Sequence, residues 1–230
     1  WSQEKDQPET RGVFIPGKRG KMLSKICIPG GSPKPYPTIL FCHGIPGVEQ
    51  LGDYCFALRQ AGFCTVQFHY SGSWGSDGDY SVGNCMEDTA SAVEYLLRNE
   101  DGLFDQQNLF VAGHSMGGLM AVYALAQFKQ LKAGAVIMPG NMGGLYLAAQ
   151  QFPEAAPVLK AVFDDFGASL QNFSWDVFRE EAAPDPKRFC LDTYAPAIAA
   201  RPVLAIAGAM DTDLPRAEHI DLLAAALLEN

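Results

Sequence analysis

The 230-residue sequence predicts an α/β protein, built on a mostly parallel twisted sheet with helices on both faces. Two observations carry this prediction. Short apolar runs typical of buried strands alternate along the chain with longer segments of helical spacing, which is the order of a parallel sheet with crossover helices. One of these runs also passes directly into a Gly-x-Ser-x-Gly pattern at residues 113–117, and an alanine-rich helical stretch follows. The length suits one domain with a sizeable core.

The chain opens with two short strand candidates, at residues 12–15 and 21–28, which a Pro-Gly-Lys-Arg-Gly turn would join. A loop rich in proline and glycine comes next. The continuous apolar run at residues 38–42 then predicts a strand that is buried on both faces.

The remaining core elements alternate between helix and strand. In chain order, beginning with a helix and ending with a strand and a helix, they are expected at residues 53–61, 64–68, 87–98, 109–112, 116–128, 133–138, 203–207 and 216–228. Strands that are separated by helices in this way are expected to pair in parallel.

The interval before the last strand holds about sixty residues, far more than a simple crossover needs. It contains helix-forming runs at residues 145–152 and 158–166 and many aromatic side chains. We therefore expect an inserted helical cap (residues 141–200) over the strand ends, with residues 11–140 and 201–230 forming the core.

Composition narrows the classes of partner. The formal net charge of −9 argues against nucleic acid and against an anionic membrane, because both bind basic surfaces. No apolar run approaches the roughly 20 residues that span a bilayer. Because the chain begins with Trp1 and not with Met, the native N-terminus and any signal peptide are left open.

The six cysteines form no Cys-x-x-Cys pair and show no metal-type spacing. They are Cys27, Cys42, Cys55, Cys64, Cys85 and Cys190. Several stand in apolar runs, where a cysteine behaves as a small buried hydrophobe. We expect reduced core thiols rather than a disulfide, which favours the cytoplasm.

Ser115 is the candidate nucleophile. A sharp turn between strand and helix strains the backbone at the central serine, and the glycines two residues before and after it must lack side chains so that strand and helix can pass closely. The hydroxyl is then held at the tip of the strand, near the N-terminus of the helix.

The loop at residues 43–47, His-Gly-Ile-Pro-Gly, directly follows the strand at 38–42. A backbone N–H of this loop and the N–H of Met116 would together form an oxyanion hole. His43 is interpreted as an orienting residue of the loop and not as a general base. An ordinary strand-to-helix turn is the alternative.

Asp211 follows the strand at 203–207 and could hydrogen-bond a histidine and fix its tautomer. Asp213 is the competing carboxylate, which a helix N-cap or a solvated turn would also explain. The other strand end where an acid could stand, after residues 133–138, reads Pro-Gly-Asn and offers no carboxylate. Asp211 is therefore favoured.

A third loop, at residues 68–78, is rich in glycine and small polar residues. A structural loop is the default interpretation, and the alternative is that Tyr70 or Trp74 lines an acyl site.

Together these segments resemble the α/β-hydrolase superfamily. Four motifs stand at strand ends in family order, at residues 43–47, 72–78, 113–117, and 208–211 followed by Pro215. Within the superfamily the chain is similar to bacterial serine esterases, among them the cinnamoyl and feruloyl esterases, and to their dipeptidyl-peptidase-like relatives. The resemblance covers residues 21–228 and implies the α/β-hydrolase fold with an inserted helical cap.

By this resemblance Ser115 is the nucleophile and Asp211 is the acid of the triad. The N–H groups of Ile45 and Met116 are the oxyanion donors. The residues expected beside the substrate are His43, Gly44, Tyr70, Trp74 and His114. His69 is a departure, since relatives often carry at this position an aspartate that braces the loop.

The general base is the larger departure. Family order places the histidine after the acid and after one more strand. The histidines of this chain are His43, His69, His114 and His219. His219 is interpreted as a surface or lid-facing helix residue, and elbow geometry would point His114 away from the hydroxyl. We expect the catalytic histidine to lie in a last strand and helix outside this sequence, with His219 as the fallback.

The sequence thus predicts a serine hydrolase that cleaves a carboxylic ester with an aryl or medium-chain acyl group through an acyl-enzyme. It implies no metal and no organic cofactor, and its partner is a small-molecule ester. A peptidase or thioesterase uses the same residues and stays open, as does a non-catalytic relative without the histidine. The intact serine, glycines and acid argue against the last alternative. The oligomeric state is left open.

Overall fold

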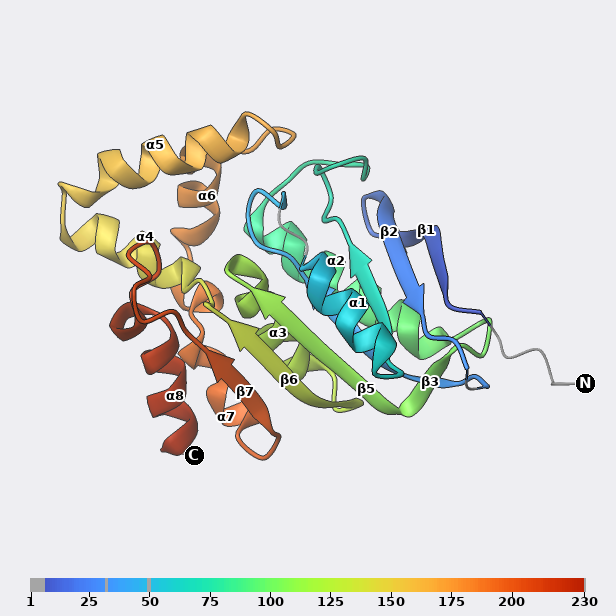
Figure 1. The fold of residues 1–230 in the computed structure, drawn as a ribbon. Coiled ribbons are helices and arrows are strands. Elements are labelled where there is room, and N and C mark those ends of the chain that lie inside the picture. The colour runs from blue at the N-terminus through green and yellow to red at the C-terminus, as the bar shows by residue number, and fades with distance from the viewer. Residues whose placement is uncertain (1–6, 32, 49–50, 230) are drawn as a thin grey trace, which may run out of the picture.

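The computed structural model describes residues 7–31, 33–48 and 51–229. In these ranges seven strands form one sheet in the order β1-β2-β4-β3-β5-β6-β7 (Figure 1). The strands are β1 (Glu9–Gly17), β2 (Gly20–Ile28), β3 (Tyr36–Cys42), β4 (Cys64–Phe68), β5 (Phe104–His114), β6 (Leu131–Ile137) and β7 (Val203–Ile206). The hairpin of β1 and β2 joins the sheet antiparallel, and β4, β3, β5, β6 and β7 are parallel to one another. The α/β class is confirmed.

The helices follow the predicted alternation. They are α1 (Gly52–Gln60), α2 (Val82–Arg98), α3 (Met116–Gln127), α4 (Met142–Gln151), α5 (Ala155–Gly167), α6 (Trp175–Ala182), α7 (Ala195–Ile198) and α8 (Ile220–Leu228). Three short 3₁₀ turns accompany them: η1 (Pro186–Phe189), η2 (Asp192–Tyr194) and η3 (Arg216–Glu218). No helix in the described ranges is long and apolar enough to cross a membrane.

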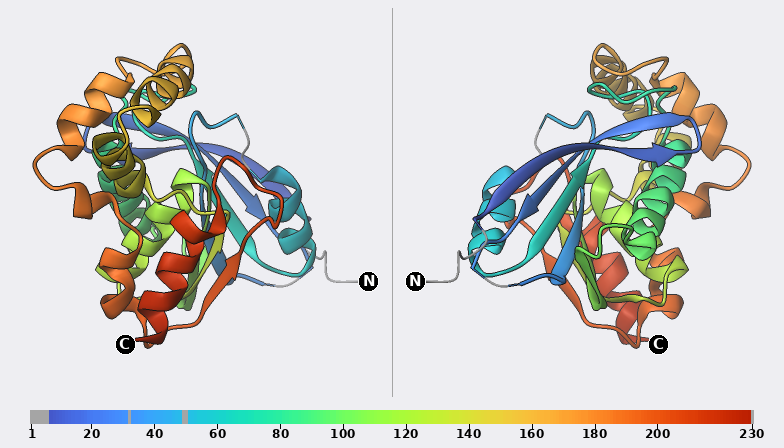
Figure 2. Two further views of the ribbon diagram at one scale, coloured as in Figure 1. Left: turned by 90° about the vertical axis from the view of Figure 1, so that its left-hand side faces the viewer. Right: turned by 90° about the vertical axis from the view of Figure 1, so that its right-hand side faces the viewer.

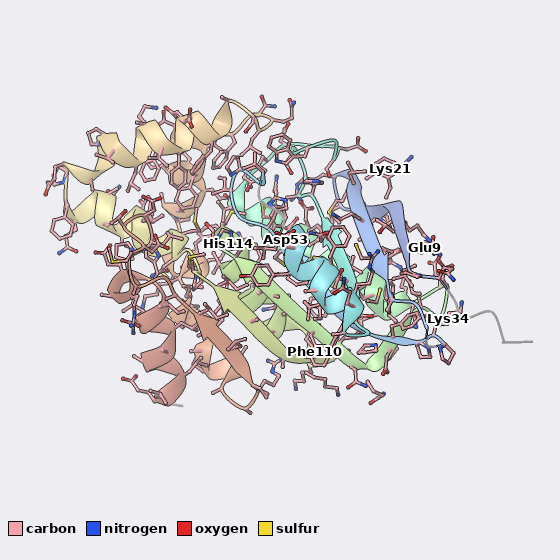
Figure 3. The ribbon with its side chains drawn as sticks, viewed as in Figure 1. Glu9, Lys21, Lys34, Asp53, Phe110 and His114 are labelled. Atoms are coloured by element: carbon pink, nitrogen blue, oxygen red, sulfur yellow. The ribbon has the colours of Figure 1, made fainter. Side chains whose placement is uncertain are left out.

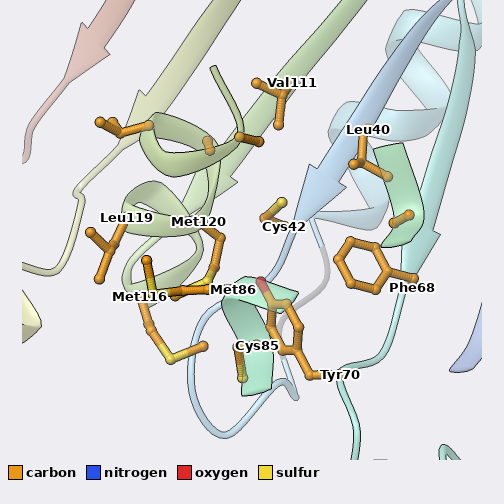
Figure 4. Packing of buried hydrophobic residues seen from close by; sticks show 14 of the residues in the cluster. Leu40, Cys42, Phe68, Tyr70, Cys85, Met86, Val111, Met116, Leu119 and Met120 are labelled. Carbon is orange, nitrogen blue, oxygen red and sulfur yellow. The ribbon is translucent and has the colours of Figure 1, made fainter. Parts of the chain in front are cut away.

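The sheet separates two layers of helices. Helix α1 covers one face, while α2 and α3 cover the other with α7 and α8 beside them (Figure 2). Every residue of β4 is buried, as expected for a strand covered on both faces. The main core joins Leu40 and Val111 of the sheet to Met120 of α3, with Phe68 and Tyr70 close by (Figure 4).

Two helix boundaries differ from the sequence expectation for physical reasons. Helix α2 begins at Val82, earlier than predicted, because Ser81 caps it by accepting a hydrogen bond from the Asn84 N–H at 3.1 Å. The final helix is split at His219, between η3 and α8, because the His219 backbone leaves the helical region with φ −127° and ψ −89°.

The helices α4, α5 and α6 stand above the carboxyl ends of β5 and β6 (Figure 1), whereas α7 returns to pack on α3. The aromatic side chains of α5 and α6 pack against one another as part of the main core. The ring centroid of Phe163 lies 5.2 Å from that of Phe178 and 5.1 Å from that of Trp175. All six cysteines are buried free thiols, so the expectation of unpaired core thiols is confirmed.

Candidate active site

Four parallel strands bring the predicted site segments to one edge of the sheet. Cys42 at the end of β3 pairs with Gly113 of β5. Ile137 at the end of β6 pairs with His114 of β5 on one side and with Ile206 of β7 on the other. The segments that follow these four strands therefore converge, which is where ligands bind in α/β sheets.

Ser115 forms the turn between β5 and α3 with a φ of 55°, in the left-handed region that non-glycine residues rarely adopt. Its N–H donates to the Ile137 carbonyl at 3.1 Å, and its carbonyl accepts from the N–H groups of Gly118 and Gly140, both at 2.8 Å. Three backbone hydrogen bonds thus hold the strained turn in place.

Glycines allow this turn to form. A Cβ on Gly113 would overlap the Gly117 carbonyl, and one on Gly117 would overlap the Cys42 carbonyl of the neighbouring strand. The strand, the turn and the helix therefore have the close packing that the Gly-x-Ser-x-Gly pattern predicted.

The Ser115 hydroxyl is bordered by glycine backbone. A Cβ on Gly44 would lie 2.9 Å from the Ser115 Cβ and 3.3 Å from its Oγ, and one on Gly140 would lie 3.3 Å from the Met116 backbone nitrogen. Met116 is fully buried, and its backbone N–H stands at the start of α3, directly after Ser115.

The oxyanion loop (residues 43–47) is oriented by His43. Nδ1 of His43 donates to the Gly44 carbonyl at 2.6 Å. In a trans peptide the C=O and the following N–H point in opposite directions, so this bond turns the Ile45 N–H away from the imidazole. Burial lowers the pKa of His43 to about 3, so the ring is neutral at pH 7. This geometry favours the orienting role.

Three side chains expected beside the substrate do not line the pocket of Ser115: the buried His43, and Tyr70 and Trp74. Tyr70 is fully buried, its ring 4.4 Å from that of His43, and its hydroxyl donates to the His43 carbonyl at 3.1 Å. Trp74 does not line the pocket either, because its indole N–H is directed to the Pro46 carbonyl at 2.6 Å. Both side chains support the oxyanion loop from outside the pocket.

The loop after β4 is braced despite the histidine at position 69. The buried carboxylate of Asp88 in α2 accepts from the Ser71 N–H at 2.7 Å and from its hydroxyl at 3.0 Å. Asp88 of α2 thus holds the loop that an aspartate at position 69 often braces in relatives. The ring centroid of His69 lies 5.4 Å from that of His43.

Asp211 follows β7 and lines the pocket of Ser115. Its Oδ1 accepts from the N–H groups of Asp213 and Leu214, at 3.1 and 2.9 Å, in a turn that the carboxylate stabilises. The other oxygen, Oδ2, could accept a hydrogen bond from an imidazole. Asp213 is no helix cap, since η3 begins after Pro215; its exposed carboxylate lines the same pocket.

His219 is not at the surface, and that expectation is corrected. Only 2% of the residue is exposed, and its Nδ1 accepts from the Asn141 N–H at 2.8 Å. Nδ1 is therefore unprotonated, and the proton is on Nε2, which has no hydrogen-bond partner among the described residues. The ring does not line the pocket of Ser115, and burial lowers the pKa of His219.

A cavity of about 860 Å³ opens beside Ser115, between the sheet edge and the helices α4 and α5. Of the predicted site residues it is lined by Ile45, His114, Ser115 and Asp211, and Figure 3 shows His114 at the end of β5. Asp213, the competing carboxylate, also lines the cavity, and the lining residues that sequence reasoning missed are Met138, Gly140, Met142, Leu145, Val158, Leu159, Ala161, Val162, Phe163, Asp165, Phe166, Thr212 and Leu214.

One pattern in the sequence predicts some of these lining residues. Val158, Val162 and Phe166 are spaced four residues apart in α5, so they lie on one helix face. The cavity is thus mainly apolar around the serine, with the carboxylates at its margin, and suits an uncharged acyl or aryl group.

Comparisons with known proteins agree with this fold. A model described as "Alpha/beta hydrolase family" matches residues 39–228. An uncharacterized 31.7 kDa protein in the traX-finO intergenic region of Escherichia coli is 31% identical over 129 residues, which make up 50% of this chain and 44% of that protein.

Two solved structures are similar across nearly the whole chain. Pyrococcus horikoshii acylaminoacyl peptidase has a TM-score of 0.67 at 18% identity, covering 96% of this chain and 35% of that one. The Pyrococcus furiosus esterase Pf2001 has a TM-score of 0.67 at 20% identity, covering 97% of this chain and 79% of that one. The matched region spans less than half of the E. coli protein and of the peptidase.

Proposed function

The chain belongs to the α/β-hydrolase family, and from this premise we propose that it is a serine hydrolase that cleaves a carboxylic ester through an acyl-enzyme. One observation carries the proposal: the strained Ser115 turn, bordered by Gly44 and by the Met116 N–H, opens on an apolar cavity of about 860 Å³. This arrangement supports the proposal that a nucleophile, an oxyanion site and an acyl pocket are adjacent, as acyl transfer requires.

In the proposed mechanism Ser115 Oγ attacks the ester carbonyl while an imidazole takes its proton. The N–H groups of Ile45 and Met116 stabilise the oxyanion of the tetrahedral intermediate. That intermediate collapses to the acyl-enzyme, and the alcohol leaves with the proton. Water then attacks the acyl-enzyme while the imidazole takes its proton. The carboxylic acid is released as the imidazole returns the proton to Ser115 Oγ, and Asp211 orients the imidazole throughout.

We propose that none of the four histidines of the sequence is the base. His43 uses Nδ1 for the Gly44 carbonyl and is buried. His69 lies beside His43, and burial lowers its pKa to about 4. His219 uses Nδ1 for the Asn141 N–H. His114 lines the cavity beside Ser115, but it precedes the nucleophile on β5, whereas in the family order the base follows the acid.

The proposed substrates carry aryl or medium-chain acyl groups. The helix face of Val158, Val162 and Phe166 supplies an apolar wall that a short acetyl group would not fill. In this proposal residues 141–200 are the cap and residues 11–140 and 201–230 the core. The buried thiols favour a reducing compartment, and we propose the cytoplasm.

A serine peptidase is the second candidate, because the similar structures include a peptidase as well as an esterase. A thioesterase would use the same groups. Matched p-nitrophenyl ester and p-nitroanilide substrates separate ester from amide cleavage, and a thioester of the same acid tests the third case.

The test of the proposed function is covalent trapping. The protein is incubated with p-nitrophenyl phenylacetate in the presence of imidazole, quenched in acid and digested. We expect a phenylacetyl group on the peptide that contains Ser115 and none in Ser115→Ala. An adduct on another residue, or no adduct at all, would contradict the proposal.

A further inference from the structure

Trp74 holds the oxyanion loop together with His43. Its indole Nε1 donates to the Pro46 carbonyl at 2.6 Å. Both rings lie close to Gly47, which has a φ of 98°; a Cβ there would lie 2.6 Å from the His43 Cε1 and 2.9 Å from the Trp74 Nε1. An imidazole and an indole therefore both contact the loop, and each binds one of its carbonyls.

Burial alone does not explain the position of Trp74. The residue is 40% exposed and adopts a φ of 47°, both of which are unfavourable for a tryptophan. The hydrogen bond to Pro46 is the specific contact that this conformation gains. Pro46 has no N–H, so this segment of the loop has few backbone groups with which to hold itself.

The brace loop (residues 71–80), which carries Trp74, is fixed to strand and helix. Asp88 of α2 accepts two hydrogen bonds from Ser71. The Asp77 N–H donates to the Lys21 carbonyl at 2.9 Å, and the Leu23 N–H donates to the Ser76 hydroxyl at 2.9 Å. Two strand residues and one buried acid thus anchor the loop to the core.

The brace loop is also fixed to the cap. The Gln171 N–H donates to the Gly72 carbonyl at 2.9 Å, and the Gln171 carbonyl accepts from the Tyr80 N–H at 3.0 Å. Asn172 Nδ2 adds a bond to the Asp79 carboxylate at 2.8 Å. Trp74 therefore reaches the oxyanion loop from a frame that is tied to both the core and the cap.

We propose that Trp74 is a positioning residue for the oxyanion hole, and this rests on the proposed function. The indole N–H fixes the Pro46 carbonyl. This bond thereby keeps the backbone N–H of the preceding residue, Ile45, near the Ser115 hydroxyl. Loss of the indole N–H lets the Ile45 donor drift, and a drift of about 1 Å from the oxyanion costs up to about 100-fold in rate. Ground-state binding of the acyl group in the cavity is unaffected, because Trp74 does not line it.

The test compares Trp74→Phe, which keeps a ring and removes the N–H, with Trp74→His, which restores a ring N–H. Hydrolysis of p-nitrophenyl phenylacetate is measured at fixed imidazole, with the Ser115→Ala rate subtracted. We expect kcat to fall about tenfold to 100-fold in Trp74→Phe with KM within about twofold, and most of kcat to return in Trp74→His.

Three outcomes overturn the inference or separate it from the proposed function. An unchanged kcat in Trp74→Phe, or a loss that appears in KM alone, overturns the positioning role. An equal loss of kcat in both variants, with a lowered Tm in both, makes Trp74 a purely structural residue. Absence of any Ser115-dependent reaction in the unmodified protein contradicts the proposed function itself.

Discussion

His219 is held by Asn141: the backbone N–H of Asn141 donates to its Nδ1 at 2.8 Å, across 78 positions of the chain. Asn141 also accepts from the Leu191 N–H at 3.2 Å and donates to the Glu218 carbonyl at 3.3 Å. One asparagine thus joins the start of α4, the segment between η1 and η2, and the end of η3. The imidazole of His219 is one of the supports of this junction.

Replacement of His219 by alanine should therefore reduce stability and leave the chemistry in place. The Asn141 N–H would lose its buried partner, which costs about 1–3 kcal/mol of unfolding free energy. Urea unfolding measures this loss, and imidazole-dependent turnover of the folded variant should match the unmodified protein. A variant of normal stability without turnover would instead identify His219 as the base.

Gly44→Ala should abolish turnover without unfolding the protein. The new Cβ would lie 2.9 Å from the Ser115 Cβ and 3.3 Å from its Oγ, in the space that the attacking hydroxyl needs. We expect a loss of at least about 100-fold in kcat/KM, as for removal of an oxyanion donor. Gly12→Ala is the matched control, since a Cβ there meets no atom within 4 Å. Equal activities of the two variants would refute the close approach of Gly44 to the nucleophile.

Acyl preference should follow the apolar face of α5. Hexanoyl and phenylacetyl esters should have higher kcat/KM values than the acetyl ester, because they bury apolar surface against Val158, Val162 and Phe166. Phe166→Ala should lower kcat/KM for the phenylacetyl ester about tenfold and leave the acetyl ester nearly unchanged. Equal specificity constants for acetyl and phenylacetyl esters would show that α5 does not contact the acyl group.

The carboxylates of the cavity should disfavour anionic substrates. Asp165 and Asp213 line it together with Asp211, and no lysine or arginine is among its described lining residues. The p-nitrophenyl monoester of adipic acid should therefore react more slowly than p-nitrophenyl hexanoate. Asp165→Asn combined with Asp213→Asn should narrow this difference about tenfold at low salt, and added salt should narrow it in the unmodified protein. Equal rates for the two esters at low salt would show that the carboxylates of the cavity do not repel an anionic substrate.

Acid should destabilise the fold before its carboxylates titrate. Burial lowers the pKa of His43 from 6.5 to about 3 and that of His69 from 6.5 to about 4. Between these values and 6.5 the unfolded chain binds more protons than the folded chain, so stability is lost as the pH falls below 6.5. His43 alone accounts for roughly 2 kcal/mol between pH 7 and pH 5.

Urea unfolding at pH 7 and pH 5 measures this effect. The loss between the two pH values should be smaller in His69→Gln than in the unmodified protein, since one of the histidines whose pKa is lowered by burial no longer titrates. A free energy of unfolding that is the same at pH 7 and pH 5 would show that neither imidazole is buried in its neutral form.

The sequence was most informative where local spacing sets geometry. Gly113, Ser115 and Gly117 form a tight turn by steric necessity, so their pattern predicted the close passage of strand and helix that the structure has. Tyr70 was misplaced because its loop position looked like pocket lining, whereas its hydroxyl is directed inward to the His43 carbonyl. His219 was misplaced because its partner, Asn141, is remote in sequence and binds through a backbone N–H that no residue pattern reveals.

In the proposed mechanism Ser115 is the nucleophile, and none of the four histidines is its general base. The most direct measurement is hydrolysis of p-nitrophenyl phenylacetate by the 230-residue protein over a range of imidazole concentrations, with Ser115→Ala as the background at each concentration. We expect little turnover without imidazole and a Ser115-dependent rate that rises with imidazole. High turnover without imidazole, abolished by replacing any one of the four histidines, would contradict the claim.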